Sequence, residues 1–178
     1  MKATGIVRRV DELGRIVVPK EIRRTLRIRE GDPLEVYTDR EGEIILKKYS
    51  PVGELSNFAT QYAKVLAETT GKLVCICDKD HIIASYGAGK KNFENRPITQ
   101  QLERVIDQRS DFSTRHGGNA VSIVDGDELE HAGQVISIVN VHGDALGAVI
   151  LLGTDVMTEM DETLVKTTAE FLGSIMED

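Results

Sequence analysis

Two spacings of apolar residues run along this chain and divide it into two bodies. Over the first fifty residues the spacing mostly alternates, as in half-buried strands, with one short helical stretch. Pro19 stops a strand and favours the start of that helix. The spacing predicts a small β-rich module with strands over 4–11, 15–18, 34–38 and 44–49 and a helix over 20–27.

The rest of the chain shows helical spacing at both ends and in the middle, with apolar strands between. Helices are predicted over 54–70, 98–108 and 157–176, and strands over 72–78, 82–85, 121–124, 135–142 and 145–152. A turn-rich joint at 50–53 separates the two bodies. We therefore expect an α+β protein with domains over 1–50 and 56–178 and a linker over 51–55.

The N-terminal module is too small to be stable by itself. Ile16, Val17 and Val18 are consecutive, so both faces of their strand need to be covered. A module of about fifty residues lies near the size at which a disulfide, a metal or a partner chain becomes necessary, and residues 1–50 contain no cysteine. The sequence therefore predicts an obligate dimer in which strands of two chains interleave.

Charge is distributed unevenly between the two bodies. The whole chain has a formal charge of −7, but residues 1–29 hold nine Lys or Arg and three acids, net +6. Residues 51–178 hold ten basic and twenty acidic residues, net −10. So large a local excess repels itself unless a polyanion lies against it. A polyanion-binding N-terminal module is therefore favoured over a merely solvated, arginine-rich surface.

The predicted helix over 20–27 separates its apolar and basic side chains. At about 100° per residue, Ile22 and Leu26 fall close together and the basic residues fall opposite them. Arginine suits bidentate contacts to phosphate and guanine. Residues 1–36 contain no aromatic side chain that could stack on unpaired bases, which favours double-stranded DNA over single-stranded RNA. Eight residues are too few for a recognition helix, so binding should depend mainly on phosphates and DNA shape.

A long motif in the N-terminal module resembles a known family. The run TGIVRRVDELGRIVVP at 4–19, continued by EIRRTL at 21–26 and ILKKY at 45–49, is similar to the AbrB-type transition-state regulator domain. The resemblance implies a swapped-hairpin dimer that binds DNA. Four arginines match the DNA-contacting positions of that family: Arg8, Arg15, Arg23 and Arg24. Three further basic residues are expected to contribute to the same DNA-binding face: Lys2, Arg9 and Arg27.

The whole chain resembles the stage V sporulation T regulators of spore-forming Firmicutes, whose second domain is GAF-like. This resemblance implies a transcription regulator, both activator and repressor, of late forespore-type genes, located in the cytoplasm with the nucleoid. A GAF-like α/β sandwich implies a pocket for a small effector between the sheet and the loops around the helix over 98–108. The loop over 113–119 could act as a lid, although such loops are more often simple connections.

The first and last helices of the second domain, over 54–70 and 157–176, are expected on one side of the sheet. A second copy could complete a four-helix bundle with them. If that contact joins different chains from those that exchange N-terminal strands, the protein is a tetramer. The sequence thus predicts self-association through both domains.

Metal and membrane chemistry are not expected. Asp125, Asp127, Glu128 and Glu130 could be a metal or acid–base cluster, but a solvated turn around Gly126 fits better. The four histidines show no ligand spacing, so neither a metal nor a cofactor is predicted. The longest apolar run, 148–152, is too short to span a membrane, and residues 1–14 lack the apolar core of a signal peptide.

Two alternative functions use parts of the same pattern. A GAF-fold reductase would need reactive cysteines in exposed, electropositive loops, whereas Cys75 and Cys77 lie two apart in an apolar strand and suit a core. Antitoxins also use swapped-hairpin DNA binders, but a short, largely disordered tail follows there. Here 128 residues with predicted helices and strands follow position 50. A DNA-binding regulator without enzymatic activity is therefore the favoured interpretation.

Overall fold

The computed structural model describes residues 5–127 and 132–177. The chain divides into two compact units, Met1–Tyr49 and Ser50–Asp178. Residues expected to form a linker begin the second unit as the short helix α2 (Pro51–Glu54), in which Val52 is fully buried. Ser50 caps this helix, because its hydroxyl accepts a hydrogen bond from the Gly53 amide at 3.0 Å and donates one to Asp78 at 2.7 Å. The segment after Tyr49 is therefore fixed to the second unit.

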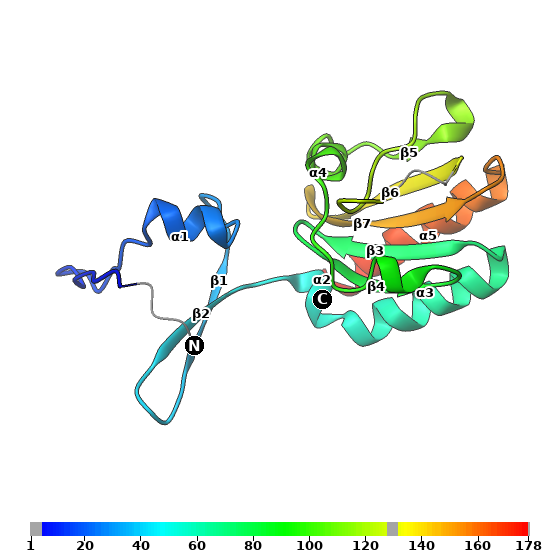
Figure 1. Ribbon diagram of the computed structural model, residues 1–178. Helices are drawn as coiled ribbons and strands as arrows, with labels where there is room; N and C mark the ends of the chain where they lie inside the picture. Colours follow the sequence, from blue (N-terminus) through cyan, green and yellow to red (C-terminus); the bar gives the residue numbers. More distant parts are fainter. Residues whose placement is uncertain (1–4, 128–131, 178) are drawn as a thin grey trace. The chain divides into compact units, whose positions relative to one another are not determined.

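The described part of the N-terminal unit, from residue 5 onward, contains one helix and one hairpin (Figure 1). Helix α1 (Lys20–Thr25) starts directly after Pro19, as the sequence predicts. Strands β1 (Leu34–Thr38) and β2 (Ile44–Lys48) pair antiparallel and confirm the predicted hairpin. These short elements agree with the sequence pattern to within about two residues, which is the usual uncertainty at element ends.

The two strands predicted over 4–11 and 15–18 are absent from the described part of the single chain, so this prediction is wrong for an isolated protomer. Their turn is present: the Gly14 amide donates to the Asp11 carbonyl, and the Asp11 amide donates to the Arg15 carbonyl, both at 3.0 Å. A strand forms only where a neighbouring backbone pairs with it along its length. Between residues 5 and 18 the described chain forms this turn but no ladder of paired strands.

The second unit is built on a five-stranded antiparallel sheet in the order β4-β3-β7-β6-β5 (Figure 1). The strands are β3 (Leu73–Asp78), β4 (Ile82–Tyr86), β5 (Phe112–Ser113), β6 (Gly133–Val141) and β7 (Asp144–Gly153). The predicted hairpin of β6 and β7 is confirmed, with its turn at His142 and Gly143. Both residues have positive φ, 49° and 87°, as a two-residue type I′ turn requires.

Helices cover both faces of this sheet. On one face, α3 (Ser56–Thr70) and α5 (Glu159–Ile175) bury residues such as Leu66 and Leu172 in one apolar cluster. On the other face, α4 (Gln100–Asp107) buries Leu102 and Ile106 in a second cluster. The placement of the outer helices on one side of the sheet is therefore confirmed. Among the helices of the described residues, none has the length and apolarity needed to cross a membrane.

The strand predicted over 121–124 is wrong. Val124 forms only an isolated bridge to Ile98, and the backbone of Val121 is bound by a side chain instead of a strand. Its N–H donates to Gln134 Oε1 at 2.7 Å, and its carbonyl accepts from Gln134 Nε2 at 2.8 Å. The edge position next to β6 is taken by β5, which is too short to be recognised as a strand from apolar spacing.

Candidate nucleic-acid interface and second-domain groove

The predicted DNA-contacting residues that the structure describes all lie on the surface of the N-terminal unit. They are Arg8, Arg9, Arg15, Arg23, Arg24 and Arg27. Lys2 lies outside the described residues. Arg23 and Arg24 are neighbours in the last turn of α1, and the others come from the segments before and after this helix. Exposed guanidinium groups at this density form a surface to which a polyanion can bind.

A tight turn controls the direction of Arg15. Asp11 Oδ1 accepts hydrogen bonds from the amides of Leu13 and Arg15 at 2.9 and 2.8 Å, and Asp11 Oδ2 accepts one from Arg15 Nε at 2.8 Å. The Arg15 amide and then the Arg15 guanidinium are the main causes that lower the pKa of Asp11. Asp11 therefore holds both the backbone and the guanidinium Nε of Arg15.

Asp32 is a structural residue of this unit that the sequence analysis did not single out. Its Oδ2 accepts a hydrogen bond from the Arg29 amide at 2.8 Å and pairs with Lys48 Nζ at 3.0 Å. Burial opposes ionisation of Asp32, but these donors outweigh it and the pKa is lowered. Lys48 also donates to the Arg27 carbonyl at 3.1 Å, so the end of α1 is attached to β2. In the sequence, the turn-forming run Gly31-Asp32-Pro33 was the available indication that Asp32 has a structural role.

The N-terminal unit leaves an unusual number of apolar side chains exposed. Val7 and Val17 are 84% and 74% exposed, Leu26 is 57% exposed and Val36 is 61% exposed. Folded domains keep most such residues inside, and contiguous exposed apolar surface marks an interaction site. A single chain therefore does not complete the core of this unit.

Cys75 and Cys77 lie side by side in β3 with no exposure to solvent. They face α4, within the apolar cluster that also contains Ile150 and Leu102. Burial is the main cause that raises the pKa of both thiols. Thiols in this environment are inert, as the sequence pattern indicated.

The face of the sheet toward α4, where the sequence analysis placed an effector pocket, is packed with apolar side chains. Two cavities lie instead next to α5 and the short edge strand β5. Their volumes are about 260 and 320 Å³, and both are lined by Asp111, Ser137 and Lys166. These two cavities together are called the α5 groove below.

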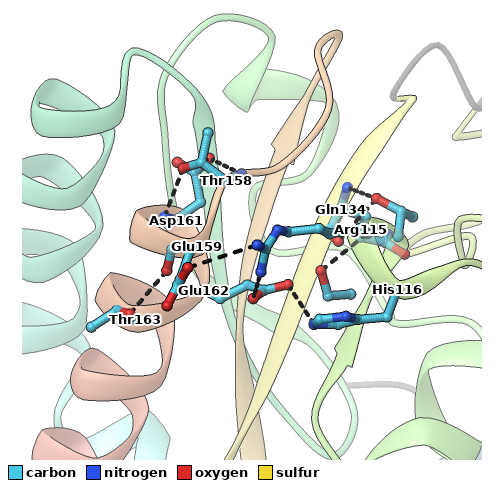
Figure 2. A network of polar contacts seen from close by, with 10 residues as sticks. Arg115, His116, Gln134, Thr158, Glu159, Asp161, Glu162 and Thr163 are labelled. Carbon is cyan, nitrogen blue, oxygen red and sulfur yellow. Dashed lines mark hydrogen bonds and ion pairs between the residues drawn. The ribbon is translucent and has the colours of Figure 1, made fainter.

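A network of charged residues lies at one end of the α5 groove (Figure 2). From the 3₁₀ turn η2 (Thr114–His116), Arg115 pairs with Glu162 at 3.0 Å and approaches Glu159 at 3.8 Å. His116 Nε2 lies 3.1 Å from the second oxygen of Glu162. The hydroxyl of Ser113, followed by Arg115 and His116, lowers the pKa of Glu162. The segment expected as a loop over 113–119 is thus tied to α5.

Of the four acidic residues around Gly126, for which a solvated turn was favoured over a metal cluster, the structure describes two. Asp125 is exposed, and Asp127 Oδ2 accepts a hydrogen bond from the Ile123 amide at 3.5 Å. Glu128 and Glu130 lie outside the described residues. Within the parts of the chain that the structure describes, no group of His, Cys, Asp or Glu side chains has the arrangement of a metal site.

Residues 54–177 match the family described as stage V sporulation protein T C-terminal, transcription factor. The chain is also 49% identical over 178 residues to stage V sporulation protein T of Bacillus subtilis strain 168, covering 99% of each sequence. The chain belongs to the stage V sporulation protein T family. It is therefore a sporulation transcription regulator and not an enzyme, which confirms the function and the family favoured by its sequence.

The N-terminal unit has relatives of its own. Residues 7–54 match the family of MazE bacterial antitoxins. A segment of 51 residues is 69% identical to the transition state regulatory protein AbrB of B. subtilis, covering 29% of this chain and 52% of AbrB. The solved N-terminal DNA recognition domain of AbrB is 69% identical, covering 29% of this chain and 94% of that domain at a TM-score of 0.25. The likeness to AbrB is thus one of sequence.

The second unit resembles solved GAF domains in fold. The GAF domain of PixJ from Thermosynechococcus elongatus is 11% identical and covers 73% of this chain and 89% of that domain, with a TM-score of 0.56. The predicted architecture, an AbrB-type unit followed by a GAF-like domain, is therefore confirmed. The antitoxin interpretation accounts only for the N-terminal match, whereas the sporulation family accounts for the whole chain.

Proposed function

We propose that this protein binds double-stranded DNA through the basic surface of its N-terminal unit, and that it activates and represses late forespore-type genes. The seven contacting residues would be Lys2, Arg8, Arg9, Arg15, Arg23, Arg24 and Arg27. The observation that carries the proposal is the combination of exposed arginines with exposed apolar side chains in one small unit. The 69% identity to AbrB, whose N-terminal domain is described as a DNA recognition domain, supports it.

The same unit would act as a swapped-hairpin dimer. The segment before α1 forms no strand in the described single chain. Its apolar side chains are 49% to 84% exposed: Val7, Val10, Ile16 and Val17. Strands contributed by a second chain would bury these residues and complete the backbone ladder. Dimerisation would also double the number of basic residues on the DNA-binding surface.

The GAF-like domain would add a second contact between chains and a site for a small effector. Phe58 and Val65 on α3 and Phe171 on α5 are 51%, 60% and 40% exposed. The ring of Phe171 lies 4.8 Å from that of Tyr62, so the two helices present a continuous apolar surface. Two such surfaces would form a four-helix bundle and convert the dimer into a tetramer. Light scattering at micromolar concentration tests this step, and a dimeric mass would contradict it.

The experiment that tests DNA binding is a salt series with the full chain and random-sequence duplex DNA. If about six phosphates are neutralised, the logarithm of the association constant should fall against the logarithm of the salt concentration with a slope of roughly −5. Arg15→Ala and Arg24→Ala should each weaken binding by about tenfold or more, because each removes charge-assisted hydrogen bonds from both protomers.

Arg40→Ala is the matched control, since Arg40 is an exposed arginine in the turn between β1 and β2 and is not among the proposed contacts. It should leave affinity within about twofold of the wild-type value. A slope near zero, or equal losses in all three variants, would contradict the proposed interface. Loss of the dimer in the Arg15 or Arg24 variant would mean that these residues stabilise the fold instead.

A further inference from the structure

A largely buried serine lies in the middle of an apolar strand in the second domain. Ser137 of β6 is 3% exposed, and its neighbours on the same face, Val135 and Val139, belong to the core beneath α5. In the described part of the chain the Ser137 hydroxyl makes no hydrogen bond. Its oxygen is not among the fully buried side-chain atoms that lack a partner, so the hydroxyl still reaches solvent. Ser137 lines both cavities of the α5 groove, so its hydroxyl is directed toward this space.

Opposite charges stand on the two walls of the α5 groove at this position. Lys166 projects from α5, and its nearest carboxylate is Glu170 on the same helix at 3.9 Å, a loose surface pair. Asp111 lies just before β5 on the other wall. Its Oδ1 accepts a hydrogen bond from the Ile138 amide at 3.0 Å. No ion pair joins Asp111 to Lys166 among the residues that the structure describes, so the two charges are held apart.

The Glu162 carboxylate lies at one end of the groove and contacts residues of η2, although its Oε1 accepts no hydrogen bond in the described structure. Glu162 receives Arg115 and His116, as Figure 2 shows, and the Ser113 hydroxyl. It therefore serves to fix η2 against α5. The residues that line both cavities are Ser137 on the floor, Lys166 on one wall and Asp111 on the other.

We propose that the α5 groove binds a small zwitterion that carries an amino group next to a carboxylate, that is, a free α-amino acid. Its carboxylate would accept hydrogen bonds from Ser137 and Lys166, and its ammonium would donate to Asp111. A ligand with both charges can pair with Lys166 and Asp111 at once and bond to the Ser137 hydroxyl, whereas a simple anion or cation can pair with only one of these two charged side chains. A cavity of about 260 Å³ on one side leaves room for a side chain.

This proposal rests on the effector-binding part of the proposed function and is independent of DNA binding. The test is thermal unfolding of the full chain with each of the twenty L-amino acids at matched ionic strength. Acetate serves as a probe that carries only the carboxylate of such a ligand, and ethylamine as one that carries only the ammonium group. An amino acid at about a hundredfold excess over its dissociation constant should raise Tm by about 5 °C or more. Acetate and ethylamine should change Tm by less than about 1 °C.

Three variants define the site. Ser137→Ala, Lys166→Met and Asp111→Asn should each remove most of the Tm increase, and the last of these keeps an oxygen that can accept from the Ile138 amide. Lys64→Met is the matched control, because Lys64 on α3 also pairs with a glutamate four residues later at 3.9 Å but lies outside the groove. This control should keep the full increase.

Ser137→Ala gives a second readout in the absence of any ligand. Because the hydroxyl has no partner, its removal should leave Tm unchanged or raise it. A fall of more than about 2 °C would mean that the hydroxyl stabilises the fold, and the proposal would be wrong. No shift with any amino acid, equal shifts with acetate or ethylamine, or a shift that persists in all three variants would also overturn it. Loss of DNA binding with amino-acid binding intact would count only against the proposed function.

Discussion

Asp161 offers the sharpest test of how the second domain is held together. It lies at the start of α5, where its Oδ2 accepts hydrogen bonds from the amide and the hydroxyl of Thr158, both at 2.8 Å. Its Oδ1 pairs with Lys72 Nζ at 3.1 Å, and the two side chains are only 5% and 19% exposed. One residue thus completes a capping box and connects α5 to the start of β3.

The effect of Asp161→Ala can be worked out from these contacts. Loss of the cap interaction costs about 1 kcal/mol, and removal of a charged hydrogen-bond partner from a largely buried ammonium costs about 2 kcal/mol. The free energy of unfolding should therefore fall by about 3 kcal/mol, which corresponds to a decrease in Tm of roughly 8–10 °C for a domain of this size. Thermal and urea unfolding at pH 7 measure both quantities.

Asp144→Ala is the matched control for this prediction. Asp144 pairs with Arg109 at 3.2 Å, nearly the same distance, but the two side chains are 75% and 56% exposed. Water and salt screen such a pair, so its loss should cost less than about 0.5 kcal/mol. Equal effects of the two substitutions, or a loss below about 1 kcal/mol for Asp161→Ala, would refute the reasoning from burial.

The pH dependence of the unfolding free energy provides a second test of the same prediction. Burial opposes ionisation of Asp161, but the donors from Thr158 and Lys72 outweigh it, so the pKa lies below its ordinary value of 3.8. A carboxylate with a lowered pKa contributes stability above the pKa of the unfolded chain and loses it as the pH falls through the folded value. The difference in stability between wild type and Asp161→Ala should therefore be constant from about pH 5 to 7 and should narrow below about pH 4. A difference that widens in acid would contradict the assignment.

Three further substitutions or treatments test other parts of the second domain. Gly173→Ala would place a Cβ 2.6 Å from the Asn140 carbonyl oxygen. Thermal unfolding should therefore show a free energy of unfolding lower by about 1–2 kcal/mol, despite the better helix propensity of alanine. A higher free energy of unfolding would contradict the close packing at this position. Gln134→Ala removes both bonds to Val121 and should speed hydrogen exchange of the Val121 amide by at least about tenfold, whereas an unchanged rate would show that this bond is not needed. Burial raises the pKa of Cys77, so a thiol reagent at pH 8 should react only after unfolding, and rapid labelling of the native protein would disprove its burial.

Elements with strong local signals could be predicted from the sequence. The hairpin of β6 and β7 has a glycine at its turn and long apolar strands on both sides, and α5 has the capping residue Thr158 before a helical stripe. The strand over 121–124 could not be excluded in the same way, because its apolar residues have the spacing of a strand. What decides its structure is Gln134, a residue distant in sequence that binds the backbone of Val121.

The candidate sites differ in how far the sequence reveals them. The proposed DNA-binding residues are recognisable because arginines concentrate in a short motif, and their charge is visible without any tertiary information. The α5 groove was not predictable, since Ser137 is a single polar residue in an apolar strand. Only the fold places it opposite Lys166 and Asp111, and only the fold shows that the expected face of the sheet is filled by the cluster around α4.

The position of the groove on α5 determines how an effector could influence DNA binding. A ligand changes the affinity at another site only if it binds two states of the protein with different affinity. Lys166 lines the groove, and Phe171, five residues later on the same helix, belongs to the apolar surface shared with Tyr62 on α3. If the proposed contact between GAF-like domains forms, a ligand that fixes α5 would act on it, and thus on the number of DNA-binding units held in one assembly. Because linked sites bind cooperatively, a change in assembly alone would alter apparent DNA affinity without any change at the arginines themselves.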